Sequence, residues 1–150
     1  MQLFRKVASF GTNREELKNI YVLFVRSLLE QSATVWHSSL TEENKTDLER
    51  VQKTALKLIL EEKYITYKHA LRLLDLENLS ERRENLCLAF ALKTSKNEKF
   101  RDMFPLKSKE HPMNTRKPEK FEVQHAHTER LKQSTVIFMQ NLLNDHEHSK

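Results

Sequence analysis

The 150-residue sequence contains very little glycine and proline and a single cysteine. Domains rich in β-structure need glycine-containing turns, so one glycine and three prolines favour helices joined by polar loops. Cys87 cannot form a disulfide within the chain, which indicates a reducing compartment. We therefore expect an all-α protein, mainly a helical bundle, that is intracellular and located in the nucleus or the cytoplasm.

Long apolar runs are also missing. The first six residues lack the apolar core of a signal peptide. The longest early apolar stretch, from Ile20 to Val25, ends at Arg26 and is far too short to cross a membrane. We therefore expect no membrane partner.

Clustered aspartates are absent as well. The two-metal mechanism of polymerases needs aspartates that lie close together. This chain has only four, none of them adjacent: Asp47, Asp75, Asp102 and Asp145. A glycine-rich phosphate loop cannot be built with Gly11 alone. We expect no catalytic residues, no cofactor and no enzymatic activity from this chain by itself.

Two histidine pairs raise the question of a metal site. His125 and His127 alternate, as do His146 and His148, and alternate residues of a strand share one face. No thiolates or clustered carboxylates nearby would complete a tetrahedral site, so surface histidines are the favoured interpretation. Cys87 lies in an apolar segment and is interpreted as a core residue rather than a nucleophile.

The composition, 38% hydrophobic and 31% charged, is that of a globular chain, and its net charge of +5 is unevenly spread. Residues 93–120 hold nine basic and four acidic side chains, whereas residues 1–92 hold 14 and 13. A basic loop can contact phosphates by charge attraction, and a solvated linker would explain the same excess. The candidate nucleic-acid contacts in this loop are Lys107, Lys109, Arg116 and Lys117.

The first long helix is predicted to begin at Thr12 or Asn13, with acidic residues in its first turn. Apolar residues recur at helical spacing along one face: Leu17, Ile20, Tyr21, Phe24 and Leu28. Further apolar residues widen this stripe. Either the helix is largely enclosed, or it faces a partner outside this chain.

A second helix is predicted after Thr41, which is a good N-cap. Its packing side comprises Leu48, Val51, Ala55 and Ile59. On a helical wheel, at about 100° per residue, three cations lie roughly 140–200° from Leu48: Arg50, Lys53 and Lys57. We call these three residues the cationic ridge. It is suited to a sugar-phosphate backbone, although a solvated amphipathic face gives the same pattern. Trp36, after the first helix, is interpreted as a core anchor rather than a platform for a base.

The following segment is predicted to form a short helix, Tyr67–Leu74, and another that Ser80 caps. The run Leu86–Leu92 is apolar on all sides, which predicts the buried centre of the domain. Asn97 is predicted to cap the end of this helix, and Pro105 to stop the helical turn that follows.

The C-terminal third is predicted to be less regular. Residues 121–128 alternate in polarity and predict an extended segment. A short helix should begin at Ser134 or Thr135, and the tail from Asn144 should fray. The expected organisation is a helical domain at 1–104, which the resemblance given next likens to a polymerase thumb, a basic exposed loop at 105–120, and the extended segment with its helix at 121–150.

Several short phrases, in their shared order and spacing, resemble one known family. They are Phe10-Gly11, Tyr21-x-x-Phe24-Val25-Arg26, Leu29-Glu30, Val35-Trp36-His37-Ser38-Ser39-Leu40-Thr41, Leu48-Glu49-Arg50-Val51-Gln52-Lys53, Tyr67-x-x-Ala70-Leu71, Leu79-Ser80-Glu81-Arg82-Arg83, Phe104-Pro105-Leu106, Thr128-Glu129-Arg130 and Leu142-Leu143-Asn144. The chain resembles the thumb and post-polymerase region of reverse transcriptases from non-LTR retrotransposons of the jockey-like group. That family usually has a tyrosine where this chain has Gln31.

The resemblance implies a non-catalytic fragment or remnant of an RNA-directed DNA polymerase. Its helices would grip RNA, DNA or an RNA–DNA duplex through backbone contacts, which position a duplex without reading its sequence. An upstream polymerase core would be a partner in the parent enzyme. The alternatives are a helical protein-interaction module and the product of a decayed element without retained activity.

Overall fold

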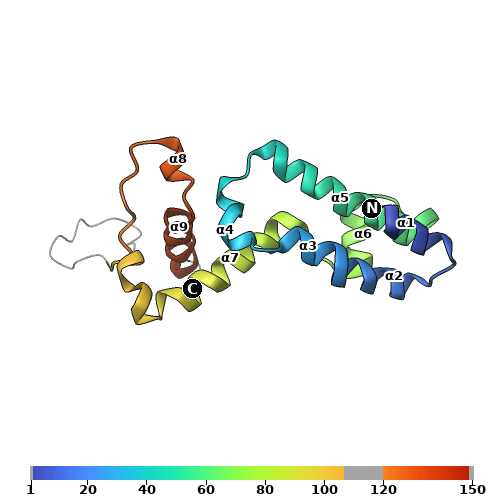
Figure 1. The fold of residues 1–150 in the computed structure, drawn as a ribbon, viewed down its shortest axis with the longest axis horizontal. Helices are drawn as coiled ribbons and strands as arrows, with labels where there is room; N and C mark the ends of the chain where they lie inside the picture. Colours follow the sequence, from blue (N-terminus) through green and yellow to red (C-terminus); the bar gives the residue numbers. More distant parts are fainter. Residues whose placement is uncertain (1, 107–119, 149–150) are drawn as a thin grey trace. The chain divides into compact units, whose positions relative to one another are not determined.

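The computed structural model describes residues 2–106 and 120–148 of the chain (Figure 1). Its helices are α1 (Gln2–Ser9), α2 (Arg14–Ile20), α3 (Ser27–Glu30), α4 (Ala33–Trp36), α5 (Glu42–Leu60), α6 (Tyr67–Leu74), α7 (Leu79–Ser95), α8 (Glu129–Lys132) and α9 (Thr135–His148). A π-helix, Tyr21–Arg26, joins α2 to α3, and 3-10 helices occupy His37–Ser39, Glu61–Lys63 and Glu98–Met103.

The described residues form no strand, and the all-α prediction is confirmed. The only β-type contact among them is an isolated antiparallel bridge between Leu106 and Phe121. The expected extended segment at 121–128 therefore forms no strand, and its β-type pairing is limited to its first two residues. None of the described helices is long and apolar enough to span a membrane.

The chain divides into two compact units. Unit 1 comprises Met1–Ala33 and Leu40–Arg83, and unit 2 comprises Thr34–Ser39 and Glu84–Lys150. This division differs from the boundaries expected at 104 and 120. The expected boundaries follow changes in composition along the sequence. In the structure the boundary instead falls inside α7, which begins in unit 1 and continues into unit 2.

Unit 1 is built on α5, against which α1, α2 and α6 pack (Figure 1). Its core consists of Phe4, Leu17, Tyr21, Ala55, Leu56, Ile59, Leu60, Ala70 and Leu74. Two helix starts are where the sequence predicts them. The Asn13 side chain accepts a hydrogen bond from the Glu16 backbone N–H at 3.0 Å, and Thr41 accepts one from Asn44 at 3.2 Å.

The prediction of one continuous apolar face on the first helix is confirmed for its first half and wrong for its second half. Leu17 and Tyr21 are buried, but Phe24 is 65% exposed and Leu28 is 71% exposed. The cause is the π-helix that begins at Tyr21, because a π-turn contains more residues than an α-turn and shifts every later residue around the axis. Val22 and Val25 take the inner positions instead and pack against the core.

A polar network centred on the fully buried Gln52 joins the elements of unit 1. Tyr21 Oη donates to Gln52 Oε1 at 2.5 Å, and Gln52 Nε2 donates to Tyr67 Oη and to the Glu77 carbonyl, both at 2.9 Å. The Tyr67 hydroxyl in turn donates to Glu49. One amide therefore connects the π-helix, α5, α6 and the chain that leads into α7.

An ion pair adds a second connection within unit 1. The Arg82 guanidinium donates to Glu30 Oε1 at 2.5 Å, and Arg26 lies 3.7 Å from the same oxygen. The Glu30 side chain is only 12% exposed, so water screens this pair less than a surface ion pair. The contact joins the end of α3 to the first turns of α7.

The α6 prediction, Tyr67–Leu74, is confirmed. The helix ends at Asp75, whose φ of 52° is in the left-handed region, and the Leu76 N–H then donates to the Leu71 carbonyl at 2.9 Å. The predicted start of the next helix is wrong. Asn78, rather than Ser80, accepts the cap hydrogen bond from Glu81 N–H at 2.8 Å, so α7 starts earlier than expected.

In unit 2, α7 has one buried face rather than a buried circumference. Cys87 and Ala91 are buried, but Phe90 is 47% exposed, so the prediction of a fully enclosed Leu86–Leu92 run is wrong. The buried positions Cys87, Ala91 and Thr94 recur at helical spacing, so the packing partners of α7 cover one face only. The core here consists of Ala91, Phe104, Phe121, Met139 and Leu143.

Two amide side chains of α9 hold the segment after residue 120. Asn144 accepts from the Phe121 N–H at 3.0 Å and donates to the Phe121 carbonyl at 3.1 Å. One turn earlier, Gln140 accepts from Gln124 N–H at 3.2 Å and donates to the Met103 carbonyl at 2.8 Å. Asn144 is 5% exposed, so the expected fraying from this residue is wrong and α9 continues to His148.

Asn97 also differs from its predicted role. Its side chain accepts from the Lys99 N–H at 3.1 Å, which makes it the N-cap of the 3-10 helix Glu98–Met103 rather than the C-cap of α7. The predicted helical turn before Pro105 is confirmed.

Gln52→Leu should destabilise unit 1 by about 2–4 kcal/mol, because it leaves the buried Tyr21 hydroxyl without its acceptor and removes the hydrogen bonds to Tyr67 and to the Glu77 carbonyl. Urea denaturation followed by circular dichroism measures the change in unfolding free energy. The matched control is Asn44→Leu, an exposed amide on the same helix, which should cost less than about 0.5 kcal/mol. Equal losses in the two variants would contradict a central role for Gln52.

The buried tyrosine should make unit 1 sensitive to alkali. Burial raises the pKa of Tyr21 well above its ordinary value of 10.0, so the folded state keeps a proton that the unfolded chain releases. Stability is thus fully present below pH 10 and falls above it, by up to about 1.4 kcal/mol per pH unit for this one group. Denaturation at pH 9 and at pH 11 tests this, and Tyr21→Phe should show a smaller difference between the two.

Asn144→Ala should release the backbone of Phe121 selectively. Amide hydrogen exchange at Phe121 should accelerate about tenfold or more, since the variant removes both hydrogen bonds to this residue. Gln140→Ala should instead accelerate exchange at Gln124. The two variants act as controls for each other, and identical exchange patterns would show that the side chains do not hold separate points of the segment.

Candidate nucleic-acid interface

The cationic ridge lies on one rigid helix. Arg50, Lys53 and Lys57 are all on α5, which runs without interruption from Glu42 to Leu60. At about 1.5 Å per residue, Arg50 and Lys57 are separated by roughly 10 Å along the helix axis. The ridge is therefore a fixed row of charges rather than a set of independent loop residues.

Both lysines of the ridge lie over aromatic rings from the chain that follows α5. Lys53 Nζ is 5.1 Å from the centre of the Tyr67 ring, and Lys57 Nζ is 5.5 Å from that of Tyr64. Such a contact is worth about 0.5–1 kcal/mol at an exposed site. A ring neutralises no charge, so both ammonium groups can still attract a phosphate.

Arg50 is engaged differently. Its Nη1 lies 2.8 Å from Asp47 Oδ1, with both side chains more than half exposed. A surface ion pair of this kind contributes little to stability but offsets the charge of the guanidinium. Arg50 is therefore the weakest of the three as a phosphate contact in this conformation.

The ridge lies on the flank of α5 rather than opposite its packing face. The buried side chains of this helix are Gln52, Ala55, Leu56, Ile59 and Leu60, whereas the predicted Leu48 and Val51 are half-buried. The buried face is thus centred nearer to Lys53 than the sequence pattern indicated. Lys53 is accordingly half-buried, while Arg50 and Lys57 are exposed.

A shallow hollow of about 340 Å³ lies beside Lys53 within unit 1. Its lining includes Lys45, Lys53 and the carboxylates of Glu42 and Glu49. Lys45 Nζ is already 2.7 Å from Glu42 Oε1. With as many acidic as basic side chains, the hollow offers no net charge to hold a phosphate.

The four loop candidates, Lys107, Lys109, Arg116 and Lys117, lie outside the described residues. The candidate interface is therefore described for the cationic ridge alone.

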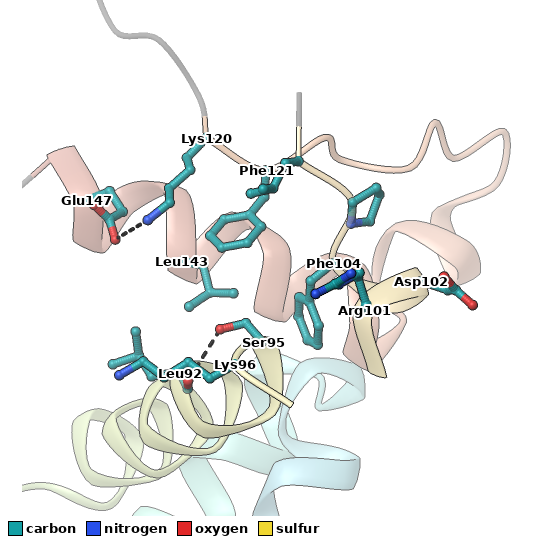
Figure 2. A pocket seen from close by; sticks show the side chains of 12 residues that line it. Leu92, Ser95, Lys96, Arg101, Asp102, Phe104, Lys120, Phe121, Leu143 and Glu147 are labelled. Carbon is teal, nitrogen blue, oxygen red and sulfur yellow. Dashed lines mark hydrogen bonds and ion pairs between the residues drawn. The ribbon is translucent and has the colours of Figure 1, made fainter. Parts of the chain in front are cut away.

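Unit 2 contains a larger pocket, of about 640 Å³, that the sequence did not indicate (Figure 2). Figure 2 shows Phe104, Phe121 and Leu143 facing this space, with Lys120 reaching toward Glu147. The Phe104 and Phe121 rings meet edge to face, with centroids 6.4 Å apart. The pocket also has three basic residues in its lining, Lys96, Arg101 and Lys120.

The basic residues of this pocket share the charge excess noted for residues 93–120, which is the only sequence signal that could have found them. Two of them have acidic neighbours. Lys120 Nζ is 3.3 Å from Glu147 Oε1, and Arg101 Nη2 is 4.0 Å from Glu98 Oε1. The aromatic rings are almost fully buried, so their faces are not open platforms for stacking a base.

The remaining chemical candidates differ in burial. Cys87 is 1% exposed, as a core residue should be. The His125 and His127 rings lie 4.6 Å apart, but no group of three metal-ligating side chains occurs in the part of the chain that the structure describes. Trp36 is half-buried. Its neighbour His37 is buried and packs edge to face on Phe138, 5.6 Å between ring centres.

Comparisons with protein-family models, curated proteins and solved structures give no match for this chain.

Proposed function

We propose that this chain is a non-catalytic fragment or remnant of a retrotransposon reverse transcriptase that grips a template–primer nucleic acid by its backbone. The proposal rests on the resemblance of the phrases given above and on one structural observation. Three cations lie in a row on the flank of a single helix, with Arg50 and Lys57 exposed and Lys53 half-buried, and both lysines lie over aromatic rings. A row of fixed charges suits the regular phosphates of a duplex and carries no sequence preference.

The proposed ligand is an RNA–DNA hybrid, and double-stranded RNA and double-stranded DNA are further ligands with the same phosphate backbone. For duplex DNA, log affinity falls with log salt concentration, and each phosphate contact makes this negative slope steeper by about 0.9. Binding through the ridge should therefore weaken steeply with salt. No metal or cofactor enters this proposal, since the chain would hold the substrate while chemistry takes place elsewhere.

Charge reversal of Arg50, Lys53 and Lys57 to glutamate should reduce affinity for an RNA–DNA hybrid at least about tenfold at low salt, and lower the salt slope by about 2–3. Fluorescence anisotropy over a series of salt concentrations measures both quantities. The matched control reverses Arg5, Lys6 and Arg14, which are exposed cations of α1 and α2 with the same summed charge. Equal losses in the two triple variants would leave only a general charge effect and contradict a role for the ridge.

Asp47→Asn gives a test in the opposite direction. It removes the carboxylate that lies 2.8 Å from Arg50, so the guanidinium becomes free to contact phosphate. Affinity for the hybrid should rise about two- to fivefold at low salt and the slope should steepen by up to about 1. In the Arg50→Glu background the same change should have much less effect, and an equal gain there would rule out Arg50 as the contact.

A second candidate function is a helical protein-interaction module. It is favoured by three adjacent apolar side chains that unit 1 leaves in solvent: Leu23 (66% exposed), Phe24 (65%) and Leu28 (71%). We call these three residues the apolar strip. Soluble domains rarely expose adjacent large apolar residues without a binding role. A chain that neither binds nucleic acid nor covers this strip would fit the third alternative, a decayed element without activity.

A further inference from the structure

We propose that the apolar strip is a self-association surface, on which the same strip of a second copy of this chain docks. This inference rests on the second candidate function and is independent of nucleic-acid binding. It starts from the π-helix, which takes Leu23, Phe24 and Leu28 out of the core and places them together on the outside of unit 1. π-turns inside helices are frequently found at functional sites.

The strip has no exposed charge within it. Between Lys18 and Glu30 the only ionisable side chain besides Tyr21 is Arg26. The Arg26 side chain is 15% exposed and lies 3.7 Å from Glu30. Docking on the strip would therefore leave no charge stranded in a dry interface, which is the usual large cost of burying a polar surface.

The one hydroxyl in the strip is already satisfied inside its own helix. Ser27 Oγ donates to the Leu23 carbonyl at 2.6 Å and also lies 3.1 Å from the Phe24 carbonyl. Covering Ser27 therefore breaks no hydrogen bond that a partner would have to replace. From outside, the surface between Leu23 and Leu28 behaves as apolar throughout.

These properties favour a second copy over a charged partner. In a symmetric pair each residue meets the same surface of the other copy, so any net charge would repel itself. An uncharged apolar strip avoids this repulsion and is complementary to itself. A nucleic acid or a strongly charged protein would gain nothing from the strip and would lose its own hydration there.

The area of the apolar strip limits how tightly two copies can associate. Three large apolar side chains, each about two-thirds exposed, offer on the order of 300–400 Å² per copy. Stable interfaces bury roughly 800 Å² per partner, so the strip should support only a weak, concentration-dependent dimer. The dimer would form where the chain is locally concentrated, and dilute samples would be monomeric.

Sedimentation velocity of the full chain tests the proposal directly. The average mass should rise with concentration from 17.9 kDa toward twice that value, and Phe24→Glu should abolish the rise. The matched control is Ile65→Glu, because Ile65 is 72% exposed in unit 1 and lies outside the strip. A wild-type chain that stays monomeric up to several hundred micromolar, or a dimer that both variants abolish, would overturn the proposal.

Cross-linking tests the symmetry. In an oxidising buffer Ser27→Cys should form a covalent dimer, since the centre of the strip meets itself, whereas Ile65→Cys should not. Cys87 is buried and should give little background. A dimer that Phe24→Glu abolishes but Ser27→Cys does not capture would overturn the symmetric arrangement. Hybrid binding by Phe24→Glu, measured below the Kd of the dimer, should equal that of the wild type, so loss of the dimer and loss of the ridge function can be told apart.

Discussion

The buried amide of Gln52 is the interaction on which unit 1 depends. Its oxygen accepts from one tyrosine, and its nitrogen donates to a second tyrosine and to a main-chain carbonyl. An apolar residue at this position would fill the space, leave the buried Tyr21 hydroxyl without its acceptor, and remove the hydrogen bonds to Tyr67 and Glu77. Because each of those groups belongs to a different element, the geometry of the amide fixes how the π-helix, α6 and the start of α7 lie on α5.

The phrases that resemble reverse transcriptases contain most members of this network and of the ion pair beside it. Tyr21, Gln52 and Tyr67 stand in three separate phrases, and so do Glu30 and Arg82, which meet at 2.5 Å. The residues on which the proposed resemblance rests thus include several that make polar contacts within unit 1. Of the proposed nucleic-acid contacts, only Arg50 and Lys53 lie within a phrase. The resemblance speaks more directly to the fold than to the ligand.

What the sequence could predict was local. Asn13 and Thr41 cap their helices through atoms three residues away, and α6 ends where a single left-handed residue stops it, so short patterns suffice. The exposed positions of Phe24 and Leu28 could not be predicted, because an ideal helical wheel assumes a constant turn and the π-helix breaks it. The offset of the cationic ridge follows similarly from Gln52, a polar residue that a hydrophobicity pattern assigns to the surface although it is fully buried.

Gln140 and Asn144 are the other residues that no local pattern could place. They bind main-chain atoms of Phe121 and Gln124, and a single bridge joins Leu106 to Phe121. The Glu122 N–H also donates to the Pro105 carbonyl at 2.8 Å. Main-chain contacts therefore tie Pro105 and Leu106 to Phe121 and Glu122 within unit 2. Because Asn144 and Gln140 also hold main-chain atoms of Phe121, Gln124 and Met103, shifting one of these segments by a single residue would break several hydrogen bonds together, so their register on α9 is fixed.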